Sequence, residues 1–183
     1  MELKSLVTTV AIITLFVTST TTLAGDYVIH AGSLIDGVSG KARNVVSVLV
    51  ENDKITAIED GFVNPQGDQK LLDLKNHTIM PGLFDLHAHL MADESYVTLP
   101  YGRSAGATAL VQLRQAQAAL QNGFTTIRSM GEQEFHYSLV DVKHAIERGE
   151  FEGPRLFVAP HMWGPTGGHG DLNNVPYGVP GEL

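Results

Sequence analysis

Residues 79–90 read Ile-Met-Pro-Gly-Leu-Phe-Asp-Leu-His-Ala-His-Leu, and this stretch decides how the rest of the chain is interpreted. A Pro-Gly break opens an apolar run that predicts a β-strand. His87 and His89 lie at the end of this run, and residues i and i+2 of a strand point to the same face. Two neutral imidazoles on one face can bind one divalent metal. A bare His-x-His pair is more often two polar residues where a strand meets a loop, so the pair alone does not define a metal site.

The segment that follows Pro81 alternates between strand and helix patterns. Apolar and β-branched runs predict three strands, at 83–90, 124–128 and 154–159. Between them, helices are predicted at 104–122 and 138–148, each followed by a glycine that would end it. This order of elements predicts parallel βαβ units.

Each predicted helix has an expected buried face. In the first helix this face is formed by Leu110, Leu113, Gln117 and Leu120, and in the second by Leu139, Val142 and Ile146. The first face is of mixed quality because it includes a glutamine, whereas the second is wholly apolar.

Residues 26–76 show a different pattern, in which short β-branched runs are separated by turns. Strands are predicted from residue 27 to an Asp-Gly turn at 36–37, and then at 45–50, 55–58 and 71–74. Several short strands joined by turns predict a portion of a small β-sandwich, which we assign to residues 25–80.

The composition excludes some classes of function. The net charge of −8 argues against a nucleic-acid partner, whose binding surface would be basic. The chain has no cysteine, so disulfides and thiolate metal sites are excluded, and any metal must be bound by histidine, carboxylate or lysine.

Residues 1–24 have the layout of a secretory signal peptide. Lys4 and the free amino terminus precede an apolar run at 6–17, and Thr22-Leu23-Ala24 places small residues before a cut at Gly25. A membrane anchor is the alternative, but the run is shorter than the roughly 20 residues that a span requires. We therefore expect cleavage, export to the periplasm or beyond, and no stable membrane anchor.

Pro81–Leu90 closely resembles the first barrel strand of the amidohydrolase superfamily of metal-dependent hydrolases. Residues 25–40 and 48–58 are similar to the amino-terminal β-sandwich of many members, and residues 123–131 resemble the second barrel strand. Gly153-Pro154-Arg155-Leu156 leads into a third strand. Residues 166–171, which read Thr-Gly-Gly-His-Gly-Asp, narrow the resemblance to the branch related to imidazolonepropionase, which includes dipeptidases of the Xaa-Pro type.

The resemblance implies an α/β fold in which residues 81–183 form the first three βα units of an incomplete (β/α)₈ barrel. Such a barrel takes about 250 residues, so we expect the chain to be the amino-terminal part of a longer protein. The alternative is an open three-stranded α/β domain that is complete in itself.

The resemblance also implies a metal centre. In the family the ends of the barrel strands hold one or two divalent metals, here expected to be Zn²⁺, and His87 and His89 match the ligands on strand one. The remaining ligands are a bridging Lys on strand four, two His on strands five and six, and an Asp on strand eight that acts as general base. All of these are expected beyond Leu183, so no catalytic residue is assigned and the chain alone is expected to be inactive.

Several further residues are candidates for the site. His169 is a candidate for binding a substrate carbonyl or carboxylate, although a plain flexible loop is the alternative. His161 and Trp163 are candidates for lining the mouth of the site, and Asp85 for orienting an imidazole or for a solvated carboxylate. The family often has Asp at position 129, where this chain has Ser129, and we assign that residue no role. The remaining histidines are expected to be structural or on the surface: His30, His77, His136 and His144.

The expected function is hydrolysis of an amide bond in a dipeptide or an N-acyl amino acid by an exported metalloenzyme. Its partner would be this small-molecule substrate, and the full-length protein could form oligomers. The alternative is a non-catalytic product, either a truncated chain or a periplasmic binding module that retains the scaffold.

Overall fold

The computed structural model describes residues 25–90, 104–132, 136–165 and 168–169. The predicted signal segment at 1–24 lies outside these residues. The chain divides into two compact units, with the division between Met80 and Pro81.

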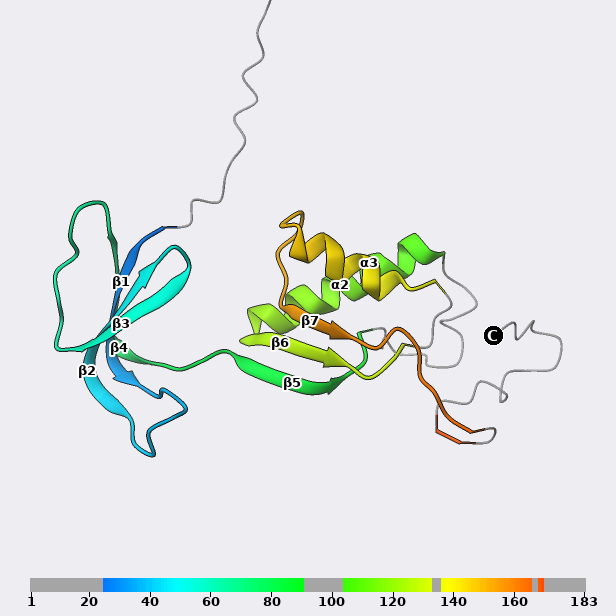
Figure 1. Cartoon of the computed structure of the whole chain (residues 1–183), viewed down its shortest axis with the longest axis horizontal. Coiled ribbons are helices and arrows are strands. Elements are labelled where there is room, and N and C mark those ends of the chain that lie inside the picture. The colour runs from blue at the N-terminus through cyan, green and yellow to red at the C-terminus, as the bar shows by residue number, and fades with distance from the viewer. Residues whose placement is uncertain (1–24, 91–103, 133–135, 166–167, 170–183) are drawn as a thin grey trace, which may run out of the picture. The chain divides into compact units, whose positions relative to one another are not determined.

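The first unit is a mixed four-stranded sheet. Its strands are β1 (Tyr27–Leu34), β2 (Arg43–Glu51), β3 (Lys54–Asp60) and β4 (Lys70–Ile79), in the order β3-β2-β1-β4 (Figure 1). β1 pairs antiparallel with β2 and parallel with β4. Within the described residues the unit is therefore one sheet, whose buried cluster is Ala31, Leu34, Val46 and Val48. The four strands predicted from the sequence are all present. β1 ends at Leu34, just before the predicted turn, and the other three strands are longer than their apolar runs.

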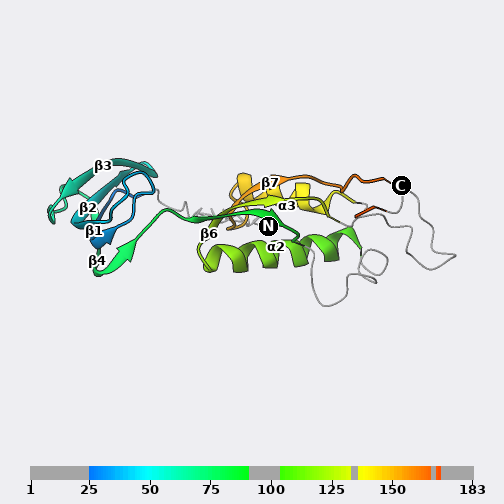
Figure 2. The ribbon, with the colours of Figure 1, turned by 90° about the horizontal axis from the view of Figure 1, so that it is seen from below.

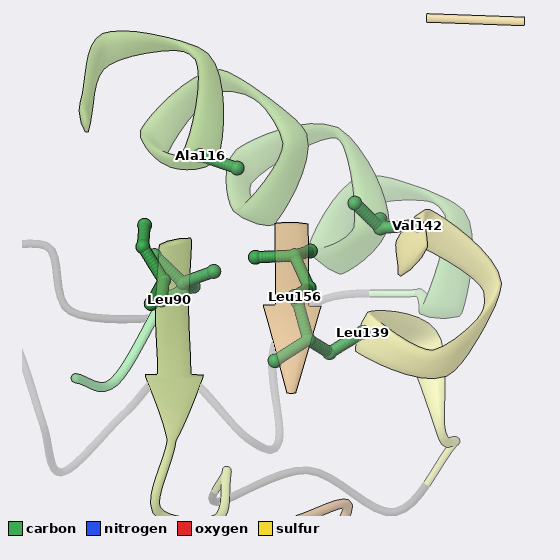
Figure 3. Packing of buried hydrophobic residues seen from close by; sticks show 6 residues of the cluster. Leu90, Ala116, Leu139, Val142 and Leu156 are labelled. Carbon is green, nitrogen blue, oxygen red and sulfur yellow. The ribbon is translucent and has the colours of Figure 1, made fainter. Parts of the chain in front are cut away.

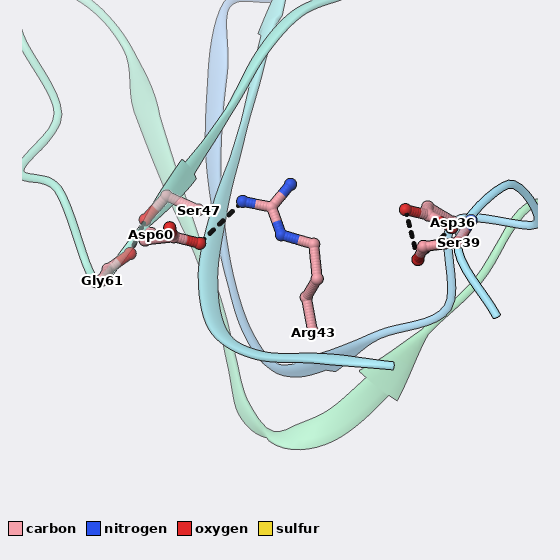
Figure 4. A network of polar contacts seen from close by, with 6 residues as sticks. All are labelled: Asp36, Ser39, Arg43, Ser47, Asp60 and Gly61. Carbon is pink, nitrogen blue, oxygen red and sulfur yellow. Dashed lines mark hydrogen bonds and ion pairs between the residues drawn. The ribbon is translucent and has the colours of Figure 1, made fainter. Parts of the chain in front are cut away.

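Polar contacts fix the loops of this sheet (Figure 4). The Asp36 carboxylate accepts hydrogen bonds from the backbone N–H groups of Val38 and Ser39, at 2.9 and 2.8 Å. These two bonds hold the pKa of Asp36 below its usual value. The Ser47 hydroxyl donates to the Gly61 carbonyl at 2.8 Å, which ties the end of β3 to the middle of β2.

The second unit contains three parallel strands. β5 (Leu83–Ala88), β6 (Phe124–Ser129) and β7 (Arg155–Val158) lie side by side in that order. The helix α2 (Ala105–Gln121) joins β5 to β6, and α3 (Ser138–Glu147) joins β6 to β7. Figure 2 shows α2 running along one face of the strands. The predicted βαβ order is confirmed, and it matches the start of a (β/α)₈ barrel.

The predicted strand at 83–90 is two residues too long. β5 ends at Ala88, whose carbonyl accepts from the backbone N–H of Met130 at 3.0 Å. Beyond this point His89 and Leu90 bond to the loop after β6 rather than to a strand. Leu90 enters the core, whereas His87 is exposed and His89 half-buried.

The core of this unit lies between the helices and one face of the sheet (Figure 3). It consists of six buried residues from both helices and all three strand regions: Leu90, Ala116, Ile127, Leu139, Val142 and Leu156. The predicted buried face of α3 is confirmed, since Leu139 and Val142 are buried and Ile146 packs against them.

The predicted buried face of α2 was partly wrong. Leu110 is 68% exposed, and the buried residues are instead Thr108, Gln112 and Ala116. These lie four residues apart, so they form one ridge along the helix. Leu113 still packs against the core, and Gln117 and Leu120 are half-buried, so the prediction fails at Leu110.

Helix α2 begins and ends at the positions that the sequence predicts. The Ser104 hydroxyl caps it by accepting from the backbone N–H of Ala107 at 3.3 Å. Gly123 follows the last turn with a φ of +91°, a conformation that glycine adopts without strain. No helix among the described residues is long and apolar enough to cross a membrane.

The two leucines Leu139 and Leu110 provide a matched pair for testing this packing. Leu139 is 1% exposed, so Leu139→Ala should lower the free energy of unfolding by about 2–5 kcal/mol. Leu110→Ala should change it by less than about 0.5 kcal/mol, because the side chain already faces solvent. Chemical denaturation of both variants checks this, and an equal loss of stability would contradict the assigned face of α2.

Candidate metal centre

The two histidines of the predicted metal pair lie side by side where β5 ends. Their ring centroids are 5.5 Å apart and the rings are steeply inclined, at 70°. Asp85 does not orient either ring through a hydrogen bond that the structure shows. Its carboxylate accepts from the backbone N–H of His87 at 3.0 Å, and so holds the strand backbone next to the pair.

The ring of His89 has a defined orientation. Its Nδ1 lies 2.7 Å from the carbonyl oxygen of Gly131. A carbonyl can only accept, so Nδ1 carries the proton and donates it. In the neutral ring this leaves the lone pair on Nε2, the nitrogen that can bind a metal. Metal-binding histidines usually donate their other ring N–H to a carbonyl or carboxylate, and His89 has this arrangement.

A cavity of about 170 Å³ opens beside the pair. The lining residues come from the ends of all three strands and the loop after β7: His87, His89, Met130, His161, Met162, Trp163 and His169. The three candidates His161, Trp163 and His169 thus reach the same cavity as the histidine pair. Trp163 is 92% exposed, which places it at the rim.

Gly131 brings the loop after β7 to this cavity. Its φ is +106°, and a Cβ there would lie 2.8 Å from the backbone nitrogen of Met162 and 2.9 Å from the carbonyl carbon of His161. Only a glycine lets the two backbones approach so closely. The ring of His161 in turn packs edge-on against Tyr137, at 4.5 Å between centroids.

Ser129 does not face the cavity. It is 2% exposed, and its hydroxyl donates to Glu132 at 2.8 Å. Sequence reasoning missed four residues around the site, namely Met130, Gly131, Glu132 and Met162. Three of them directly follow β6, and the residues after each parallel strand are where sites of this fold gather. The position of these three residues directly after a strand could therefore have identified them as site candidates from the sequence.

The remaining histidines are not among the residues that line this cavity. His30 is buried in the first unit, donates from Nε2 to the Val63 carbonyl at 2.7 Å and packs on Phe62. His77, His136 and His144 are exposed.

The described residues supply part of a metal site. Among them no group of three His, Cys, Asp or Glu side chains is placed to hold a metal ion. The fit of the pair to a metal therefore rests on one ring nitrogen from His87 and one from His89. The Gly131 carbonyl sets the orientation of the His89 ring.

Two glycine substitutions test the close approach at Gly131. Gly131 and Gly123 both have positive φ, so Ala at either position strains the backbone by about 1–3 kcal/mol. Only Gly131→Ala also forces a clash with residues 161–162, since a Cβ at Gly123 meets open space. Gly131→Ala should therefore destabilise the chain more and release the His89 ring, as measured by unfolding and by ¹⁵N NMR of the imidazole. Equal effects would exclude a role for the close approach.

Comparison with known proteins identifies relatives of most of the chain, although no family model matches it. An ochratoxinase from Aspergillus niger is 33% identical over 164 residues, a match that covers 82% of this chain and 31% of the ochratoxinase.

Solved structures agree with this match. The crystal structure of a Xaa-Pro dipeptidase with methionine bound in its active site has a TM-score of 0.73 and 32% identity, covering 82% of this chain and 37% of the dipeptidase. An amidohydrolase structure has a TM-score of 0.69 and 31% identity, covering 85% of this chain and 36% of its own. The chain spans only 31–37% of the length of these three relatives. The predicted resemblance to the amidohydrolase superfamily is confirmed, and it extends over the amino-terminal portion of these relatives.

Proposed function

We propose that the protein to which this chain belongs is a metal-dependent hydrolase of amide bonds, exported and acting on dipeptides or N-acyl amino acids. The observation that carries the proposal is the paired His87 and His89 at the end of β5, with His89 Nδ1 bonded to the Gly131 carbonyl. The family resemblance supports amide hydrolysis, since an ochratoxinase, a Xaa-Pro dipeptidase and dihydroorotases are among the relatives.

His87 and His89 would hold the metal, for which Zn²⁺ is the best candidate because imidazole and oxygen ligands suit it. When bound, the metal would polarise the scissile carbonyl and activate water for hydrolysis. The carbonyl of Gly131 keeps His89 in one tautomer and one orientation, so Nε2 is ready to bind without rearrangement. The other ligands and the general base would come from later strands, as the family resemblance implies.

The rest of the cavity would bind the substrate. His169 is exposed and lines the cavity with the histidine pair, so it can donate a hydrogen bond to a substrate carboxylate or carbonyl. Met130, Met162 and Trp163 give the cavity apolar walls, which favour a substrate with an apolar side chain.

A second candidate function is binding without catalysis. It is favoured by the absence of a three-residue metal group within the described ranges. Two histidines alone should bind Zn²⁺ weakly and supply no general base. The two candidates differ in turnover, which only the first requires.

Zinc titration tests the metal site in the 183-residue chain. His89→Ala should weaken Zn²⁺ binding by at least tenfold, because it removes one of two ligands. His144→Ala is the matched control: this histidine is exposed on α3 and should leave binding unchanged. Isothermal titration calorimetry measures both, and unchanged binding in the His89→Ala variant would refute the assignment.

Kinetics separate the proposed roles in a protein that carries the remaining barrel strands. His89→Ala should lower kcat by several orders of magnitude, because it disrupts the metal that acts in the transition state. His169→Ala should chiefly raise KM, as expected for a residue that binds the ground and transition states alike. A dipeptide-cleavage assay gives both values, and turnover by the 183-residue chain alone would show that the later strands are dispensable.

A further inference from the structure

We propose that Glu132 is a positioning residue that sets the orientation of His89 for metal binding. The inference rests on the proposed metal site at His87 and His89. It concerns a buried carboxylate to which neither the sequence patterns nor the proposed chemistry assigns a role.

Glu132 lies in the loop after β6 and is 3% exposed. One carboxylate oxygen, Oε1, accepts two hydrogen bonds. The backbone N–H of Leu90 donates to it at 3.0 Å, and the Ser129 hydroxyl donates at 2.8 Å. Both distances are typical of N–H···O and O–H···O hydrogen bonds. The carboxyl group therefore links the residues that follow β5 to the end of β6.

The N–H of Leu90 belongs to the peptide that directly follows His89. Glu132 thus fixes the backbone on one side of His89, while the carbonyl of Gly131 fixes its ring at 2.7 Å. Two consecutive residues of one loop hold the same histidine by its main chain and by its side chain. Together they determine where Nε2 points.

Ser129 couples these two contacts. Its hydroxyl donates to Glu132 and also accepts from the backbone N–H of Gly131 at 3.3 Å. The turn from 129 to 132 is therefore closed by side-chain bonds, and the Gly131 carbonyl is held in place beside the ring. This gives a role to the serine that departs from the family pattern at position 129.

Burying a carboxyl group in a core is unfavourable unless the group is hydrogen-bonded, as Glu132 is. An apolar side chain would fill the same space. What the carboxylate adds is a strong acceptor for the peptide next to His89, which is useful if the position of that histidine matters.

Residue-specific NMR in the 183-residue chain tests the proposal. Long-range ¹⁵N–¹H spectra report the tautomer of each imidazole, and a titration with Zn²⁺ reports binding at His89 and His87 separately. Glu132→Ala should mix the tautomers of His89 and weaken Zn²⁺ binding by about 10–100-fold, the usual effect of losing such an outer contact. The tautomer of His30, whose ring is held in the first unit, should not change.

Conservative variants separate positioning from simple support of the fold. Glu132→Gln keeps an oxygen acceptor and should retain the His89 tautomer and most of the affinity, whereas Ser129→Ala should give a partial loss. Glu150→Gln is the charge control: Glu150 is exposed and precedes β7, at the amino ends of the strands.

The outcomes are distinguishable. If Glu132→Ala unfolds the chain, Glu132→Gln and Ser129→Ala decide the matter through the His89 tautomer. A folded Glu132→Ala variant with an unchanged His89 tautomer and unchanged Zn²⁺ affinity overturns the proposal. If the unaltered chain binds no Zn²⁺, the two histidines alone do not make a metal site, and a shifted His89 tautomer in Glu132→Ala still supports the positioning role of the carboxylate.

Discussion

The hydrogen bond between the ring of His89 and the carbonyl of Gly131 joins the ends of β5 and β6, and the candidate site depends on it. Parallel strands that bond side by side end at the same edge of the sheet, so their following loops meet there. In this chain the contact between these loops orients the ring of His89. The backbone pairing of β5 with β6 would not orient His89 by itself, because β5 has already ended at Ala88. The loop after β6 takes over, with Gly131 holding the ring and Glu132 the backbone.

Glycine at position 131 serves both neighbouring strands. Its carbonyl faces His89, and its missing side chain leaves room for residues 161–162 of the loop after β7. Gly131 therefore orients His89 on one side of the cavity and leaves room for residues 161–162 on another. A parallel bridge between Glu132 and His161 extends the sheet pairing beyond the named strands at this point. The backbone conformation of Gly131 therefore determines the geometry of the candidate site.

How far the sequence predicts this structure depends on the range of the interactions involved. Local signals were sufficient for the elements: Ser104 begins α2, Gly123 and Gly149 follow the helices, and the β-branched runs became strands. The face of α2 was harder, because its buried ridge of Thr108, Gln112 and Ala116 is not apolar throughout, and hydrophobicity alone favoured Leu110. His87 and His89 were found because their spacing is local. Glu132 was not, since its partner Leu90 is 42 residues away in the sequence and only the pairing of β5 with β6 brings them together.

Ser129, which stands where the family often has aspartate, is likewise explained by a contact outside its own position. A serine that replaces the frequent family aspartate looks like a loss when position 129 is considered alone. In the structure its hydroxyl contacts the carboxylate of Glu132, three residues later. The buried carboxyl group of this loop therefore comes from position 132, and it accepts from the backbone N–H of Leu90, the residue after the histidine pair. A substitution at the end of a barrel strand must therefore be judged with the loop that follows it. In a parallel sheet that loop, as much as the strand, determines the orientation of the neighbouring strand's side chains.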